Sequence, residues 1–214
     1  MKKIGYVALG SLLLAIVLFI SGTMIGGFSE LETLYDKGDF TISLPITKTM
    51  DVTKLFAFSN SSLLTQSTEA VPTGSYKEQQ DEHGEGPVST YVPFRNGLFL
   101  SAAASLALSL DCGYIYYGAH ADDAAGNAYP DCTEIFYTSM GDAIFEGSGK
   151  ECSLEAPFIN CNKADVVREG LRLGVPYQPT WSCYEGGNHP CGHCGTCIDR
   201  PADFRSNGLA AQAH

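Results

Sequence analysis

The stretch Trp181–Arg200 reads WSCYEGGNHPCGHCGTCIDR and carries the densest chemical information in the chain. Its cysteines follow the spacing C-x7-C-x2-C-x2-C, at Cys183, Cys191, Cys194 and Cys197. Thiolates are soft ligands, and four of them complete the tetrahedron that zinc prefers in structural sites. Glycines inside the run supply the backbone freedom that a tight metal-binding turn needs. The spacing therefore predicts a closed structural zinc site, with a pair of disulfides or free thiols as the alternatives.

Two histidines, His189 and His193, lie in the same loop. Because four thiolates already saturate zinc, we interpret both as neighbours of the site rather than ligands. Four more cysteines are scattered among apolar segments, where cysteine usually behaves as a small buried hydrophobe. These are Cys112, Cys132, Cys152 and Cys161. A thiol-rich chain with a thiolate metal site suits a reducing compartment.

The composition is that of a globular chain with an acidic surface. The chain has 214 residues, of which 44% are hydrophobic and 17% charged, and this length is enough to bury a good core. The net charge is −11. Because binding to nucleic-acid phosphates requires a basic surface, we expect no nucleic-acid partner.

The N-terminal segment, residues 1–28, is apolar. After Lys2 and Lys3 no charged residue occurs until Glu30, and Ile4–Ile25 is long enough to cross a membrane as a helix. We therefore interpret this segment first as a hydrophobic transmembrane helix. A cleaved signal peptide is a second interpretation, although no clear cleavage site follows. The third is a buried strand over Ile4–Leu9 followed by a helix.

Further along, apolar runs typical of strands alternate with runs typical of helices. The expected helices are Phe94–Leu110, Cys132–Ala143 and Asn162–Leu173, and the expected strands are Phe40–Pro45, Tyr114–Gly118 and Glu155–Ile159. This alternation predicts an α/β fold, a Rossmann-like parallel sheet flanked by helices. We expect residues 29–178 to form an incomplete α/β domain of the nucleotide-binding type and residues 179–214 to form the zinc-binding region.

The sequence also predicts one buried helix face, one surface loop and one helix end. In the first expected helix, Leu98, Ala102, Leu106 and Ala107 share the face that we expect to be buried. The polar stretch Thr68–Pro87 is interpreted as a mobile surface loop. Gly174 is the expected C-terminal stop of the last helix.

The order of several short motifs resembles the 7-cyano-7-deazaguanine synthase family of the pyrophosphate-loop ATPase superfamily. The matching stretches are Tyr91–Asn96 (YVPFRN), Gly118–Asp123 (GAHADD), Tyr129–Cys132 (YPDC), Ala156–Phe158 (APF), Lys163–Val167 (KADVV) and Thr180–Tyr184 (TWSCY), which runs into the cysteines. The resemblance covers about residues 51–214. It implies a fold of the adenine nucleotide alpha hydrolase type and a reaction that converts 7-carboxy-7-deazaguanine, ammonia and ATP into the nitrile for queuosine biosynthesis.

The same resemblance implies ATP with Mg²⁺ as cosubstrate, a structural zinc ion, a cytoplasmic location and a homodimer. The family cradles pyrophosphate with an S-G-G-x-D-S loop, and this sequence contains no such stretch. We therefore expect weak turnover at best. Two alternatives remain open: a non-catalytic, membrane-anchored relative that binds a deazaguanine, and a truncated gene product.

The resemblance also implies the residues that bind substrate and nucleotide. They are Arg95, Asn96, Asp122, Asp123, Asp131 and Lys163. The arginine and asparagine begin a helix, where backbone N–H groups favour anions. The carboxylates suit the N–H edge of a deazaguanine, and the lysine suits phosphate. The alternatives are solvated surface roles for these side chains and, for Asp131, a helix N-cap.

Three further side chains flank the cysteines. Trp181 and Tyr184 are expected to pack against the metal site, with a stacking platform for a base as the alternative. Arg200 is expected to neutralise part of the thiolate charge from outside the ligand shell.

Overall fold

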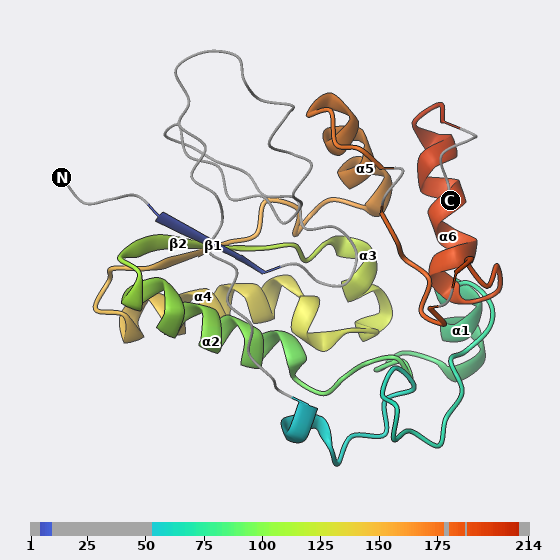
Figure 1. Cartoon of the computed structure of the whole chain (residues 1–214), viewed down its shortest axis with the longest axis horizontal. Coiled ribbons are helices and arrows are strands. Elements are labelled where there is room, and N and C mark those ends of the chain that lie inside the picture. Colours follow the sequence, from blue (N-terminus) through green and yellow to red (C-terminus); the bar gives the residue numbers. More distant parts are fainter. Residues whose placement is uncertain (1–4, 10–52, 178–179, 187, 210–214) are drawn as a thin grey trace. The chain divides into compact units, whose positions relative to one another are not determined.

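The structure is a computed structural model that describes residues 5–9, 53–177, 180–186 and 188–209 (Figure 1). The chain divides into two compact units, each described by itself below. The first, called the sheet unit, contains residues 5–9, 96–118 and 137–157. The second, called the knuckle unit, contains the described residues of 53–95, 119–136 and 158–209. The boundaries expected near residues 28 and 178 stay predictions.

The sheet unit is built on three parallel strands. They are β1 (Gly5–Leu9), β2 (Cys112–Tyr117) and β3 (Ser153–Glu155), in the order β1-β2-β3. Ile115 and Leu154 pair across β2 and β3, and both are buried. Parallel strands need crossovers, which here contain helices. The predicted α/β fold with a parallel sheet is therefore confirmed.

Strand β1 corrects the first interpretation of the N-terminus. A transmembrane helix starting at Ile4 is wrong for Gly5–Leu9, because these residues pair with β2 as a strand. The third interpretation, a strand over Ile4–Leu9, is confirmed for those five residues. The rest of the apolar segment lies outside the described residues, as does the strand expected at Phe40–Pro45. In the described part of the chain, no helix combines the length and apolarity needed to span a bilayer.

Two long helices accompany the sheet, α2 (Arg95–Ser109) and α4 (Glu134–Gly147). In Figure 1 both run along the strands on the same side of them. Gly141 of α4 lies close to Leu154 of β3. A Cβ added at Gly141 would lie 3.8 Å from the Cβ of Leu154. The Tyr137 hydroxyl donates to the Leu154 carbonyl at 3.4 Å. These contacts hold α4 against the third strand.

Of the predicted face of α2, Ala107 is buried, whereas Leu98, Ala102 and Leu106 are half-buried. The buried residues of the helix are Asn96, Gly97, Leu100, Ala103 and Ala107. They follow the helical repeat as regularly as the predicted set does. Because α2 is apolar on most of its circumference, periodicity alone does not select the face that packs.

The knuckle unit consists of short helices joined by long irregular segments. They are η2 (Thr53–Phe56), α1 (Tyr76–His83), α3 (Ala121–Ala124), η3 (Ala125–Asn127), η4 (Pro130–Cys132), α5 (Lys163–Arg172) and α6 (Gly195–Ser206). Helix α6 contacts both α1 and α5. The rings of Tyr177 and Phe204 meet edge to face, with centroids 4.9 Å apart, and both are buried. Apolar packing between α5, α6 and the segment after α5 therefore forms a core of this unit.

Helix α1 overturns the prediction of a loop over Thr68–Pro87. Ser75 accepts a hydrogen bond from the Glu78 N–H, and the Glu78 carboxylate accepts one from the Ser75 N–H. This reciprocal capping box satisfies two N–H groups that would otherwise lack partners. The S-Y-K-E sequence was a usable signal, but the polar composition of the segment obscured it.

Other element ends follow local capping chemistry. Helix α5 begins after Asn162, whose side chain accepts from the Asp165 N–H, and Gly174 follows it with φ of 73°. The predicted helix is confirmed in both respects. Helix α4 begins later than expected, and the Thr133 hydroxyl accepts from the Phe136 N–H. The N-cap role considered for Asp131 is therefore wrong. The third strand, β3, begins two residues before the predicted range and ends at its first residue, Glu155.

Candidate metal centre and neighbouring charged cluster

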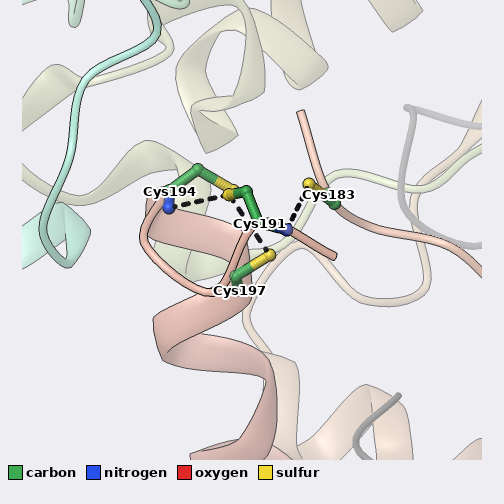
Figure 2. A group of neighbouring side chains, drawn as sticks. All are labelled: Cys183, Cys191, Cys194 and Cys197. Carbon is green, nitrogen blue, oxygen red and sulfur yellow. Dashed lines mark hydrogen bonds between the residues drawn. The ribbon is translucent and has the colours of Figure 1, made fainter. Parts of the chain in front are cut away.

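Four cysteine sulfurs converge in the knuckle unit (Figure 2). One sulfur from each of Cys183, Cys191, Cys194 and Cys197 lies within 4.8 Å of all the others. Cys194 is the N-cap of α6 and Cys197 lies in its first turn, so the helix start fixes two sulfurs. All four are free thiols, so the disulfide alternative is wrong.

Backbone N–H groups point at these sulfurs. The Cys191 N–H donates to the Cys183 sulfur and the Cys194 N–H to the Cys191 sulfur, each at 3.3 Å. The turn between them needs Gly192 in the left-handed region, with φ of 76°. Such N–H donors partly neutralise the negative charge of the thiolates. Hydrogen bonds of this kind surround the thiolate ligands of a bound cation.

The thiols differ in how readily they lose a proton. Burial opposes ionisation of Cys194, but hydrogen bonds from the Thr196 hydroxyl and from backbone N–H groups outweigh it and lower its pKa to about 6. Burial, together with its hydrogen-bonded sulfur neighbours, raises the pKa of Cys197. Cys194 is therefore more readily ionised than Cys197.

The donor set fits a metal ion such as zinc. Cys183, Cys194 and Cys197 are buried, Cys191 is half-buried, and the four sulfurs could hold one ion. His193 lies outside the group, and its ring Nδ1 is 2.9 Å from the Cys191 carbonyl. His189 is exposed and also lies outside the group.

The three flanking side chains take distinct places. The Trp181 indole N–H donates to the Cys183 carbonyl at 3.1 Å, although the side chain is partly exposed. The buried Arg200 donates to the Thr180 hydroxyl and lies over the Phe204 ring, 4.9 Å from its centroid. Burial lowers the pKa of Arg200, and Tyr177, Asp203 and Cys197 partly offset this effect.

A second group in the knuckle unit is a charged cluster around Lys163. The Lys163 ammonium lies 3.5 Å from the Asp123 carboxylate, and both side chains are largely buried. The other oxygen of Asp123 lies 3.3 Å from the His120 Nε2. His120 is buried, and within the described residues its Nδ1 has no hydrogen-bond partner. The fold thus brings Asp123 and Lys163, predicted separately, into direct contact.

Asp122 has a different partner. Its carboxylate accepts the backbone N–H of Lys163 at 2.7 Å, at the first turn of α5. A carboxylate at a helix N-terminus satisfies a free N–H group and complements the helix dipole. Asp122 therefore fixes where α5 begins, and with it the backbone of Lys163.

The electrostatics favour a charged lysine in this cluster. Burial opposes the ammonium, but Asp123, Asp203 and Asp122 outweigh it and raise the pKa of Lys163. Burial raises the pKa of Asp203 to about 6, partly offset by the lysine. Burial lowers the pKa of His120, so its ring is neutral at pH 7.

The remaining predicted residues are not placed in this cluster. Asp131 is buried in η4. Burial raises the pKa of Tyr91, and the charges of Asp131 and Arg95 also influence it. The Tyr91 hydroxyl accepts the Phe94 N–H at 2.8 Å, just before α2. Asn96 is buried in the sheet unit. The binding roles of these residues stay predictions.

Sequence reasoning singled out Tyr184, which packs against the cysteines, but missed Tyr76 and the hydroxyl contacts among three tyrosines of the knuckle unit. The hydroxyls of Tyr76, Tyr129 and Tyr184 are hydrogen bonded to one another, with Tyr76 in the middle, 2.6 Å from Tyr184 and 3.2 Å from Tyr129. The Tyr129 hydroxyl also pairs with the buried Thr90. The capping box in front of Tyr76 could have located its helix, whereas the contacts among these residues join distant parts of the chain.

Comparison with known families gives one coherent result. Residues 40–208 match the family model described as queuosine biosynthesis protein QueC. The chain is 42% identical over 162 residues to a 7-cyano-7-deazaguanine synthase of Caldicellulosiruptor saccharolyticus, covering 76% of this chain and 68% of that protein. It is 40% identical over 149 residues to the synthase of Methanoregula boonei, covering 70% and 65% of the two chains.

A third relative of the same name comes from Archaeoglobus fulgidus. It is 41% identical over 142 residues, covering 66% of this chain and 56% of that protein. The matched part therefore spans between 56% and 68% of the length of these relatives. The family expected from the sequence motifs is confirmed, and the names of the relatives support the synthase function expected with it.

Proposed function

Because the chain belongs to the family of queuosine biosynthesis protein QueC, we propose that it acts as a 7-cyano-7-deazaguanine synthase. Its reaction would convert 7-carboxy-7-deazaguanine, ammonia and ATP into the nitrile. The observation that carries this proposal is the match over residues 40–208, joined by relatives of one name at 40–42% identity.

The chemistry defines what the protein must supply. A carboxylate is a poor electrophile, so its oxygen must first become a good leaving group. Attack of the carboxylate on ATP forms an acyl adenylate and releases pyrophosphate, and ammonia then displaces AMP to give the amide. Attack of the amide oxygen on a second ATP releases pyrophosphate, and loss of AMP and two protons from the adenylated amide leaves the nitrile. Each step needs positioning and stabilisation of phosphate charge.

Lys163 is our candidate for stabilising that charge. It is a largely buried ammonium at the first turn of α5. Its counter-ion is Asp123, and the neutral His120 contacts the other oxygen of the same carboxylate. Asp131, Arg95 and Asn96 are our candidates for contacts to base and nucleotide. Mg²⁺ would accompany ATP as it does in phosphoryl and nucleotidyl transfer.

The cysteine cluster is proposed to hold a structural zinc ion. Four thiolates leave no open coordination position, and an open position is what a catalytic zinc needs to bind water or substrate. The ion would stabilise the start of α6 and the loop carrying Cys183 and Cys191. It would take no direct part in the reaction.

The function is tested by nitrile formation from 7-carboxy-7-deazaguanine, ammonia and ATP with Mg²⁺, followed by mass spectrometry. We expect slow turnover by this chain and a further fall of about 100-fold for Lys163→Met, the order found when one preorganised charge-stabilising group is removed. Lys150→Met is the matched control, because Lys150 is exposed and pairs with Glu146. Binding of the deazaguanine without ATP consumption would instead support a non-catalytic relative.

A further inference from the structure

Tyr76 is held at both ends by the metal-binding region of the knuckle unit. Its backbone N–H donates to the Asp199 carboxylate at 3.3 Å. Its hydroxyl lies 2.6 Å from the hydroxyl of Tyr184. Tyr184 directly follows the metal ligand Cys183, and Asp199 follows Cys197 by two residues in α6. Both anchors of Tyr76 are therefore placed by the segments that converge on the cysteine cluster.

Backbone contacts just before α1 strengthen this attachment. Thr73 forms an antiparallel bridge with Cys194, and the Gly74 N–H donates to the His193 carbonyl at 3.0 Å. At the same place Gly195 lies close to Tyr76, so that a Cβ added there would be 3.5 Å from the tyrosine ring. The start of α1 is thus docked on the cysteine turn by main-chain bonds as well as by side chains.

The ring of Tyr76 supports the charged cluster. The Lys163 ammonium lies over this ring, 4.8 Å from its centroid, while the Asp123 carboxylate lies 3.5 Å away. A cation over an aromatic face is attracted by the negative face of the ring, and more strongly where water is excluded. The lysine side chain has many rotamers, so ring and carboxylate together select the one that is observed.

We infer that the cysteine cluster sets the position of Lys163 through Tyr184, Asp199 and Tyr76. This inference rests on the proposed function for its consequence, because Lys163 is there the charge-stabilising residue. Tyr76, Tyr184 and Asp199 are positioning residues. When the cluster loses its ion, the turn carrying Tyr184 and the start of α6 loosen, Tyr76 loses its anchors, and the ammonium loses its aromatic support.

The test measures the reactivity of Lys163 itself, independently of turnover. The full chain loaded with zinc is treated briefly with a trace of acetic anhydride, and acetylation at Lys163 is followed by mass spectrometry. Only the free amine reacts, so a buried ammonium held by Asp123 is protected. We expect Tyr76→Phe, Tyr184→Phe and Asp199→Asn each to raise the labelling rate roughly two- to tenfold, the factor associated with one lost buried hydrogen bond.

Zinc content and the far-ultraviolet circular dichroism of each variant show whether the fold and the ion are retained. The double variant Tyr76→Phe/Tyr184→Phe should raise labelling by less than the product of the two single effects, because both single changes remove the Tyr76–Tyr184 hydrogen bond. Removing zinc from the wild type with a chelator should raise labelling at least as much. Tyr137→Phe is the matched control, since its hydroxyl bonds to Leu154 in the sheet unit, and it should leave Lys163 labelling unchanged.

Unchanged labelling of Lys163 in zinc-loaded Tyr76→Phe and Tyr184→Phe would overturn the inference. So would protection of Lys163 that survives complete removal of the ion. Failure of the proposed function has a different sign, namely no nitrile formation by the wild-type chain, whereas full nitrile synthesis by Lys163→Met would refute only the role given to Lys163. The two outcomes are therefore distinguishable.

Discussion

The sheet unit and the knuckle unit bury different kinds of side chain. In the sheet unit, the buried residues of the strands and helices are mostly apolar, such as Leu100, Ile115 and Leu154. The knuckle unit buries polar groups as well, among them His120 and Arg200. Apolar packing tolerates changes of shape that preserve volume, whereas a buried polar group depends on a specific partner. The knuckle unit should therefore be the more sensitive to single substitutions.

Cysteine shows the difference most directly. In the sheet unit, burial raises the pKa of Cys112 and of Cys152, so both are neutral small side chains at pH 7. In the knuckle unit, hydrogen bonds outweigh burial at Cys194 and lower its pKa to about 6. The same residue type is a neutral, buried side chain in one unit and a candidate metal ligand in the other, because the hydrogen-bond donors around it differ.

The largest effect is expected for Cys194→Ser. It should release the metal and destabilise the protein on the order of 5 kcal/mol, because metal binding and folding of a small site are linked. Metal analysis and urea unfolding check this under reducing conditions. Cys152→Ala in the sheet unit should keep the metal and cost about 1 kcal/mol, the order of one buried methylene. Equal losses from the two variants, or metal-free wild type, would contradict the comparison.

A smaller effect is expected for Gly170→Ala in α5. An added Cβ would lie only 2.8 Å from the Tyr177 ring carbon that carries the hydroxyl, and that ring is locked by Phe204 and by a bond to the Val167 carbonyl. Overpacking of this kind costs roughly 1–3 kcal/mol. Gly147→Ala in α4 meets no atom within 4 Å and should be neutral or stabilise by up to about 1 kcal/mol. Thermal unfolding of both variants measures the difference in stability. A Gly170→Ala variant that is more stable than the wild type would contradict the prediction.

Loss of the α5 cap comes next. Asn162→Ala removes the acceptor for the Asp165 N–H and should cost about 1 kcal/mol. Metal content should not change, because the cap is separate from the cysteines. Denaturant unfolding measures the cost. Asn162→Ser keeps a capping oxygen, so wild-type stability in this variant would identify the cap as the cause. Equal destabilisation by Asn162→Ala and Asn162→Ser would show that the cap is not the cause.

The smallest effect concerns the pH dependence of Asp203. Burial raises its folded pKa to about 6, above the ordinary value of 3.8 for an aspartate, so between these values the folded state holds its proton and the unfolded state does not. The contribution of Asp203 to stability is therefore favourable at low pH and is lost as the pH rises through about 6.

Asp203→Asn removes this dependence. Relative to the wild type at the same pH, the variant should gain stability between pH 5 and pH 7.5, because the unfavourable buried carboxylate is gone. The gain should be modest, since the side chain is only half-buried and solvent screens its charge. Paired unfolding curves of wild type and variant give the difference directly. If the stability of Asp203→Asn relative to the wild type falls as the pH rises, the prediction is wrong.

Local chemistry made several features readable from the sequence alone. The C-x7-C-x2-C-x2-C spacing located the four converging sulfurs, since two-residue gaps bring neighbouring ligands to one point. Asn162 and Gly174 marked the ends of α5 because capping depends on residues a few positions apart. The motif order identified the family. The capping box at Ser75 is an equally local signal for a helix, but the polar composition of Thr68–Pro87 favours the prediction of a loop.

Tertiary structure alone decided what depends on residues far apart in the chain. It chose a strand for Gly5–Leu9, because an apolar run suits a helix as well as a strand until a partner such as β2 is present. It selected the buried face of α2. It also placed Tyr76 between Tyr184, Asp199 and Lys163, across separations of 87 to 123 residues. Local sequence determines caps, turns and ligand spacing, whereas contacts between distant segments exist only once the chain has folded.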